Sequence, residues 1–195
     1  FCTSQFNIIS HIKFKLKFGK RKAEDLLKLP LMTDIKSLAI MRLLNASVAP
    51  AFIAQPNLFP VIVLKMVNLS LSKGNASLTP FAYSAFGIIL GSALGDYQTG
   101  EAFGNLAIEL IRVLGDKTKP IECRSVFLVV NMVNHWRHHA KLSEVLFMQS
   151  IDKERETGDL QYTSYALNNL HFQKILMRQN LLDVSNSFKK YEAFF

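Results

Sequence analysis

The chain has 195 residues, enough for one ordinary domain or a short solenoid with a sizeable core. Hydrophobic residues make up 49% of it, only 19% are charged, and there are nine Gly and six Pro. This composition excludes disordered, collagen-like and low-complexity proteins. The two cysteines, Cys2 and Cys123, cannot by themselves form a disulfide framework or a four-ligand zinc site, and they are typical of a reducing compartment.

The net charge of +8 is concentrated near the N-terminus, where a basic cluster consists of Lys13, Lys15, Lys17, Lys20, Arg21 and Lys22. Without this cluster, 17 basic residues face 15 acidic ones. The remainder therefore lacks the spread basic face of a nucleic-acid-binding domain. Apolar and basic residues alternate from Ile12 to Phe18, which is typical of a strand or an extended linker. A solvated linker is the favoured interpretation, and a contact with phosphate or anionic lipid is the alternative.

Residues 1–30 are accordingly expected to be a basic linker, and residues 31–195 a helical-repeat region. The chain begins with Phe1 rather than Met, which indicates that an upstream region is missing. No basic segment is followed by an apolar run and a small-residue cleavage site. The sequence therefore predicts a cytoplasmic fragment of a longer protein.

Two uncharged windows, residues 43–64 and 74–95, are long enough to raise the question of a membrane span. Three prolines interrupt the first window, and polar residues with a further proline interrupt the second. Because unpaired backbone polar groups are costly in hydrocarbon, we expect shorter, buried helices and no membrane span.

From Thr33 onward, apolar residues recur at helical spacing and no sustained strand-like alternation is found, so the predicted fold class is all-α. Thr33 and Asp34 supply an N-cap for the first helix, and Pro50 is expected to limit it. The second helix is apolar on nearly every side and is expected to be central. The predicted helices cover residues 35–50, 56–73, 79–94, 99–114, 120–136, 138–157, 159–177 and 181–191.

Residues 85–110 are similar to a tetratricopeptide repeat. Gly95-Asp96-Tyr97 fits the turn between its two helices, and Gly87, Gly100 and Ala107 lie at or beside the positions where the repeat has small side chains. Small residues there would let the two helices approach closely. Because the turn glycines along the chain are unequally spaced, the expected architecture is an α-solenoid of degenerate tetratricopeptide-like hairpins.

A wider resemblance rests on short segments in a fixed order: Leu26–Asp34, Ala39–Leu44, Pro56–Pro60, Lys65–Leu71, Leu94–Tyr97, Phe103–Gly104, His135–His139 and Glu156–Leu160. They resemble the helical region of very large signalling multi-kinases, which are best represented in cyanobacteria. In that family a serine/threonine-kinase-like domain and an AAA-type ATPase domain precede this region, and a GAF sensor and a histidine kinase follow it.

The resemblance implies a non-catalytic scaffold that connects an ATPase switch to sensor and kinase modules. Its partners would be proteins, held in a groove lined by alternate helices. Two other classes of function stay open: a helical enzyme with an unrecognised pocket, and a nucleic-acid binder that uses the basic cluster.

His135, His138 and His139 raise a zinc hypothesis, because spacings of three and four bring imidazoles onto one face of a predicted helix. No Glu is interleaved in the manner of a zinc protease, and Cys123 lies three turns upstream, too far to complete the ligand set. Structural or surface histidines, with Trp136 as a packing anchor, are the favoured interpretation.

Other motifs are attributed to structure. Gly115–Thr118 lacks the upstream glycine of a phosphate-binding loop, and no kinase catalytic loop, Asp-Phe-Gly or nucleophile elbow is found. Gly87, Gly91 and Gly95 indicate close helix packing, and the carboxylates within residues 152–159 indicate a solvated helix face. The sequence assigns no catalytic, cofactor-binding or metal-ligating residue.

Overall fold

The computed structural model describes residues 14, 18–19, 21–154 and 160–191, and this part of the chain is all-α, as predicted. It contains no β-strand; an isolated bridge joins Leu31 to Asn75. The α-helices are α2 (Ile35–Ala54), α3 (Leu58–Lys73), α4 (Thr79–Ile88), α5 (Tyr97–Leu114), α6 (Lys119–Leu128), α7 (Lys141–Glu154), α8 (Leu160–Leu176) and α9 (Leu181–Lys189). Much of the expected linker and the end of the helix predicted over residues 138–157 lie outside the described residues.

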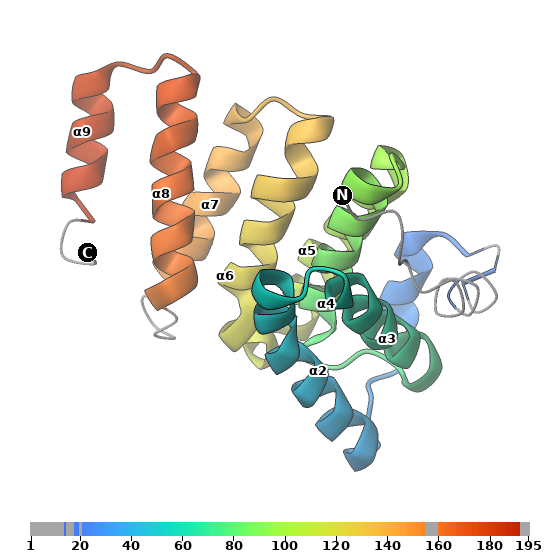
Figure 1. The fold of residues 1–195 in the computed structure, drawn as a ribbon. Coiled ribbons are helices and arrows are strands. Elements are labelled where there is room, and N and C mark those ends of the chain that lie inside the picture. Colours follow the sequence, from blue (N-terminus) through green and yellow to red (C-terminus); the bar gives the residue numbers. More distant parts are fainter. Residues whose placement is uncertain (1–13, 15–17, 20, 155–159, 192–195) are drawn as a thin grey trace.

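The α-helices form neighbouring pairs joined by short connections (Figure 1). Helix α2 packs on α3, α4 on α5, α6 on α7 and α8 on α9, while contacts of α4 with α3 and of α6 with α4 and α8 join the pairs. The first helices of the pairs begin at residues 35, 79, 119 and 160, and the second helices at residues 58, 97, 141 and 181. A two-helix unit thus recurs every 39–44 residues.

Two of these units share a further feature. Helices α4 and α6 each span 10 residues, carry a proline in the first turn and continue into a π-helix of 5 residues. These π-helices are η2 (Ile89–Ala93) and η4 (Val129–Val133). The two units therefore resemble each other in local backbone geometry as well as in helix order.

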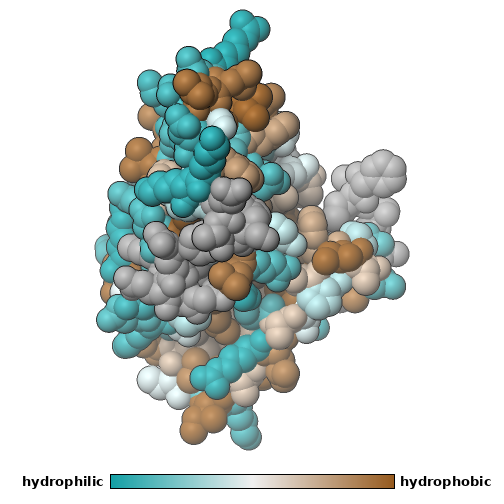
Figure 2. Space-filling model, turned by 90° about the vertical axis from the view of Figure 1, so that its left-hand side faces the viewer, coloured by the Kyte–Doolittle hydropathy of each residue, from teal (hydrophilic) through white to brown (hydrophobic). Residues whose placement is uncertain are grey.

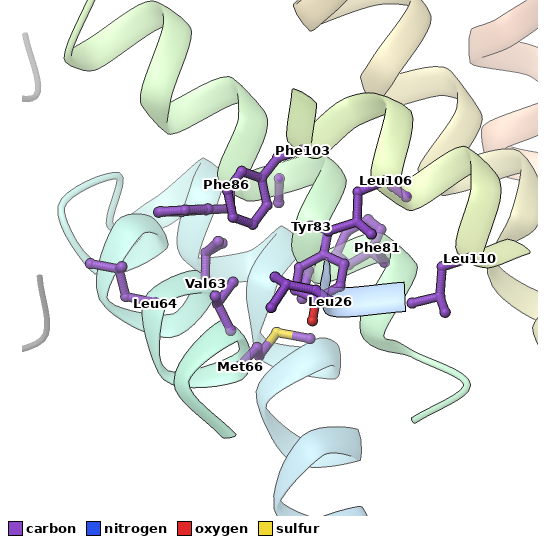
Figure 3. Packing of buried hydrophobic residues seen from close by; sticks show 14 of the residues in the cluster. Leu26, Val63, Leu64, Met66, Phe81, Tyr83, Phe86, Phe103, Leu106 and Leu110 are labelled. Carbon is purple, nitrogen blue, oxygen red and sulfur yellow. The ribbon is translucent and has the colours of Figure 1, made fainter. Parts of the chain in front are cut away.

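The larger hydrophobic cluster joins α2, α3, α4 and α5 with the 3₁₀-helix η1 (Ala23–Lys28). Val63, Leu64 and Met66 of α3 are fully buried. The central helix is nevertheless α4, which packs on α3, α5 and α6 and is buried from Thr79 to Gly87, so the expectation that the second helix is central is wrong. The rings of Phe86 and Phe103 meet edge to face with centroids 4.9 Å apart, and Figure 3 shows them beside the other buried side chains of this cluster. A second cluster joins the end of α5 with α6, α7 and α8.

The closest approach of α4 and α5 is made by two glycines. A Cβ atom on Gly100 would lie 2.8 Å from the carbonyl oxygen of Gly87, and a Cβ atom on Gly87 would lie 2.8 Å from that of Gly100. Only glycine fits at both positions without moving a backbone. The sequence-based assignment of these residues to close helix packing is confirmed.

Several predicted helix ends are confirmed. Asp34 caps α2 by accepting hydrogen bonds from the Ser37 amide at 3.2 Å and the Ser37 hydroxyl at 2.5 Å. The Ser37 hydroxyl bond lowers the pKa of the Asp34 carboxyl. Gly74 ends α3 with φ +96°, and a Cβ atom there would lie 2.1 Å from the Pro30 carbonyl oxygen. This glycine is thus required by both its backbone conformation and its neighbour.

The expectation that Pro50 limits the first helix is wrong, because α2 continues to Ala54. Proline removes one backbone hydrogen bond and crowds the carbonyl four residues earlier, here that of Ala46. Both residues lie on the exposed side of α2. The next turn is held from the opposite side by the buried Val48 and Ala51, so burial outweighs the local cost of the proline.

Asn75 joins the described N-terminal segment to the helices. Its Nδ2 donates to the Leu26 carbonyl at 2.8 Å, and its backbone amide donates to the Pro30 carbonyl at 2.8 Å. Its Oδ1 accepts from the Tyr83 hydroxyl at 3.0 Å, while its carbonyl accepts from the Met32 amide at 2.8 Å. Asn75 is 1% exposed, and its hydrogen bonds join residues 26–32 to the α3–α4 connection and to Tyr83 of α4.

Helix α2 is long and apolar enough, by length and composition, to cross a membrane. In its most apolar stretch of 18 residues, 22% of the residues are buried. The uncharged windows at residues 43–64 and 74–95 each cross a boundary between elements, at the α2–α3 turn and at the α3–α4 connection.

We expect Gly100→Ala to destabilise the protein by about 1–3 kcal/mol, because the new methyl group meets backbone that cannot move aside. This loss exceeds the gain of about 1 kcal/mol in helix propensity. Gly91→Ala is the matched control, since its Cβ atom would meet nothing nearer than 3.5 Å. Urea unfolding of both variants measures the difference; a Gly100→Ala protein as stable as Gly91→Ala would contradict the packing argument.

Burial raises the pKa of the Tyr83 hydroxyl well above its ordinary value. The folded state therefore keeps the proton that the unfolded state releases above about pH 10, so stability is present below that pH and falls as the pH rises further. We expect this loss to approach about 1.4 kcal/mol per pH unit and to be absent in Tyr83→Phe. Urea midpoints between neutral and alkaline pH test this, with the exposed Tyr97→Phe variant as the control that should behave like the wild type.

Candidate binding groove

The first helices of the four pairs line one groove. It has a volume of about 240 Å³ and receives side chains from α2, α4, α6 and α8, together with the first turn of α3 and η4. Six of the lining residues are aromatic: Phe52, Phe59, Phe81, Phe127, Tyr162 and Tyr165. The groove is therefore built by successive units rather than within one of them.

The aromatic rings contact one another in two groups. Phe52 of α2 and Phe59 of α3 meet edge to face at 5.3 Å. Phe127 of α6 lies 5.9 Å from Tyr162 and 6.1 Å from Tyr165, and these two tyrosines of α8 are 5.7 Å apart. Such contacts restrict the rings, so the groove presents a partly ordered apolar surface.

The outer part of the groove is open to solvent. Phe52 is 51% exposed and Tyr165 is 46% exposed, whereas Phe127 is 9% exposed. Large apolar side chains normally remain exposed only singly, and a contiguous group of them marks an interaction surface. Phe52 and Tyr165 are thus the residues that an incoming side chain would meet first.

The described lining of the groove carries no charged side chain. Its polar groups are the Gln161 amide and the tyrosine hydroxyls, and Gln161 Nε2 donates to the Tyr165 hydroxyl at 3.1 Å. The Arg124 guanidinium lies over the Tyr162 ring at 5.1 Å. A cavity of about 150 Å³ holds a benzene molecule, so this groove has room for large uncharged side chains.

The sequence did not reveal the α2 part of this groove. Phe52 and Ile53 follow Pro50, where the helix was expected to end. The sequence did contain one indication that the helix continues past Pro50. Val48 and Ala51 continue the helical spacing of Met41 and Leu44, and this spacing places Phe52 beside the buried face.

The three histidines of the zinc hypothesis do not lie on one helix, so that expectation is wrong. The helical segment ends with the 3₁₀-helix η5 (Asn134–Trp136), and His138 and His139 follow it. The His135 ring packs on Trp136 at 4.6 Å, and His139 Nδ1 accepts from the Lys141 amide at 3.2 Å.

Glu101 of α5 holds the segment after η5. Its carboxylate forms an ion pair with the Arg137 guanidinium at 2.5 Å and a hydrogen bond with His138 Nε2. Beside them, the Tyr97 and Trp136 rings lie 5.0 Å apart. Trp136 contacts Tyr97 and His135 but is 48% exposed, so it makes a surface contact and is not the expected packing anchor. Within the described residues, no group of three His, Cys, Asp or Glu side chains could hold a metal.

The remaining sequence motifs do not gather at the groove. Of the basic cluster, only Arg21 and Lys22 are described, and both are exposed. Gly115–Thr118 forms the short 3₁₀-helix η3, closed by a 2.8 Å hydrogen bond from the Thr118 hydroxyl to the Gly115 carbonyl. The carboxylates of residues 155–159 lie outside the described residues, while Asp152 is exposed on α7.

A separate apolar surface lies at the α8–α9 turn. Leu176, Leu181 and Leu182 are 65%, 69% and 69% exposed there. Figure 2 shows hydrophobic residues gathered near the top of the molecule, where this turn lies, with polar residues around them.

Comparison with known protein families, with curated proteins and with solved structures finds no match.

We expect added Zn²⁺ to leave the thermal midpoint unchanged, because His135, His138 and His139 have other contacts and belong to no group of three potential ligands among the described residues. A site that bound zinc in the folded state only would raise the midpoint with metal concentration. Thermal melts with and without Zn²⁺, repeated on His138→Gln, test this. A rise that His138→Gln removes would establish a metal site.

Proposed function

We propose that the chain is a non-catalytic helical-repeat scaffold, a segment of a cytoplasmic multi-domain signalling kinase with ATPase, sensor and histidine-kinase domains. Its partners are proteins or neighbouring domains of the parent chain, not nucleic acid, and it has no membrane span. Phosphotransfer belongs to other domains of the parent. The resemblance of the ordered sequence segments motivates the kinase part of this proposal.

One observation carries the scaffold part: α2, α4, α6 and α8 line the same groove. In repeat proteins, equivalent helices of successive units form an extended binding surface. The starts of these four helices, 44, 40 and 41 residues apart, are what such an arrangement requires.

The spacing also bears on the kind of repeat. A tetratricopeptide unit has about 34 residues, and other two-helix repeats have about 40–47. The units of this chain recur every 39–44 residues. This spacing is closer to that of the longer two-helix repeats, so the tetratricopeptide-like hairpins of the proposal require helices or turns that have been lengthened.

The groove chemistry favours binding over catalysis. Its described lining offers aliphatic and aromatic side chains, the Gln161 amide and two tyrosine hydroxyls, and no carboxylate, histidine or cysteine. An active site needs titratable or nucleophilic groups within reach of one another. A peptide segment with large uncharged side chains is the ligand that this surface suits.

The test is selection from a random peptide library displayed on phage. We expect the selected peptides to carry aromatic or aliphatic residues and few charges, and to lose at least about tenfold in affinity for Phe52→Glu and Tyr165→Glu, since each change places a charge in an apolar groove. Affinity is measured by fluorescence polarisation of the selected peptides.

Phe172→Glu is the matched control, because Phe172 lies on α8 like Tyr165, is 59% exposed and does not line the groove. Peptides that bind all three variants equally would show that the groove is not the binding surface. ATP hydrolysis or self-phosphorylation by the purified chain would contradict the non-catalytic assignment.

A further inference from the structure

Helix α2 combines an apolar sequence with an exposed position. Its outward side carries a ridge of six exposed residues spaced by three or four: Ile35, Ala39, Leu43, Ala46, Pro50 and Ile53. Ile35, Leu43 and Ile53 are 81%, 70% and 81% exposed. A contiguous row of exposed apolar side chains normally marks a surface that another molecule covers. Within the described residues, nothing covers this ridge.

All charged side chains of α2 are positive. Lys36 and Arg42 flank the ridge on its two sides, both are exposed, and α2 contains no Asp or Glu. No acidic residue occurs from residue 35 to residue 95.

The whole sequence shows the same asymmetry. Residues 1–95 contain eleven Lys and Arg against three Asp and Glu, while residues 96–195 contain twelve of each. The entire net charge of +8 therefore belongs to the half of the chain that contains α2.

We propose that the α2 ridge docks on the surface of an anionic lipid bilayer. The helix lies along the membrane with Ile35, Leu43 and Ile53 between the headgroups, and Lys36 and Arg42 reach lipid phosphates. A bilayer surface supplies apolar and negative groups together, which matches the ridge and its flanks. A second copy of the chain would instead bring the same positive charges together.

The packing of α2 explains why it lies on the bilayer and does not cross it. The ridge is about 27 Å long, yet the opposite side of the helix holds Met41 and Val48, which are buried in the hydrophobic cluster with α3. Crossing the bilayer would pull these side chains out of the core. Docking leaves them in place.

The experiment is flotation of the full chain with vesicles of phosphatidylcholine alone or with about one third phosphatidylserine. We expect binding to the anionic vesicles that falls with added salt, and little binding to the neutral ones. Leu43→Gln combined with Ile53→Gln should weaken binding at least about tenfold, because the two side chains no longer enter the bilayer. Lys36→Gln combined with Arg42→Gln should weaken binding to the anionic vesicles.

The matched control is Leu176→Gln combined with Leu181→Gln, which removes two equally exposed leucines at the α8–α9 turn. This control should float like the wild type. Circular dichroism melts check that each variant is folded. Equal flotation of the ridge variant and the wild type would overturn the proposal, as would absence of flotation. Ridge-dependent dimerisation in sedimentation without lipid would overturn it in favour of a second copy.

Discussion

The contact of Gly87 with Gly100 sets the geometry on which the described fold depends. Because neither residue has a side chain, the backbones of α4 and α5 come closer than any other residue pair would allow. This brings Phe86 and Phe103 edge to face in the centre of the larger cluster. The adjoining Val129 and Val133 pack against Gly104 from η4, so the same close contact also positions the following unit.

Polar side chains also stabilise the packing of the helices. Asn75 joins the segment from Leu26 to Met32 to the α3–α4 connection by hydrogen bonds, and the buried Tyr83 hydroxyl donates to its side chain. On the other side of α5, Glu101 holds Arg137 and His138. Both arrangements bind an irregular segment to a helix surface. The pairs of helices are therefore joined by specific hydrogen bonds and ion pairs as well as by apolar packing.

The helices and their ends could be predicted from the sequence because their causes are local. Asp34 caps a helix through Ser37 three residues on, and Gly74 ends one through its own backbone. The groove could not be predicted, since Phe52, Phe127 and Tyr165 line one groove only through the packing of different units. The predicted helix end at Pro50 was wrong for the same reason. The burial of Val48 and Ala51 depends on tertiary packing, which a proline in the sequence does not indicate.

The π-helices η2 and η4 have a consequence for how the chain tolerates changes in length. A π turn holds one residue more than the α-helical turn that it replaces. The loss of a single residue within Ile89–Ala93 or Val129–Val133 would therefore convert the π turn into an α-helical turn at that place. The neighbouring turns would keep their rotation about the helix axis, so unequal spacing between units need not disturb the surfaces on either side. In such a chain, the length of a repeat can change during evolution while the packing of the helices is kept.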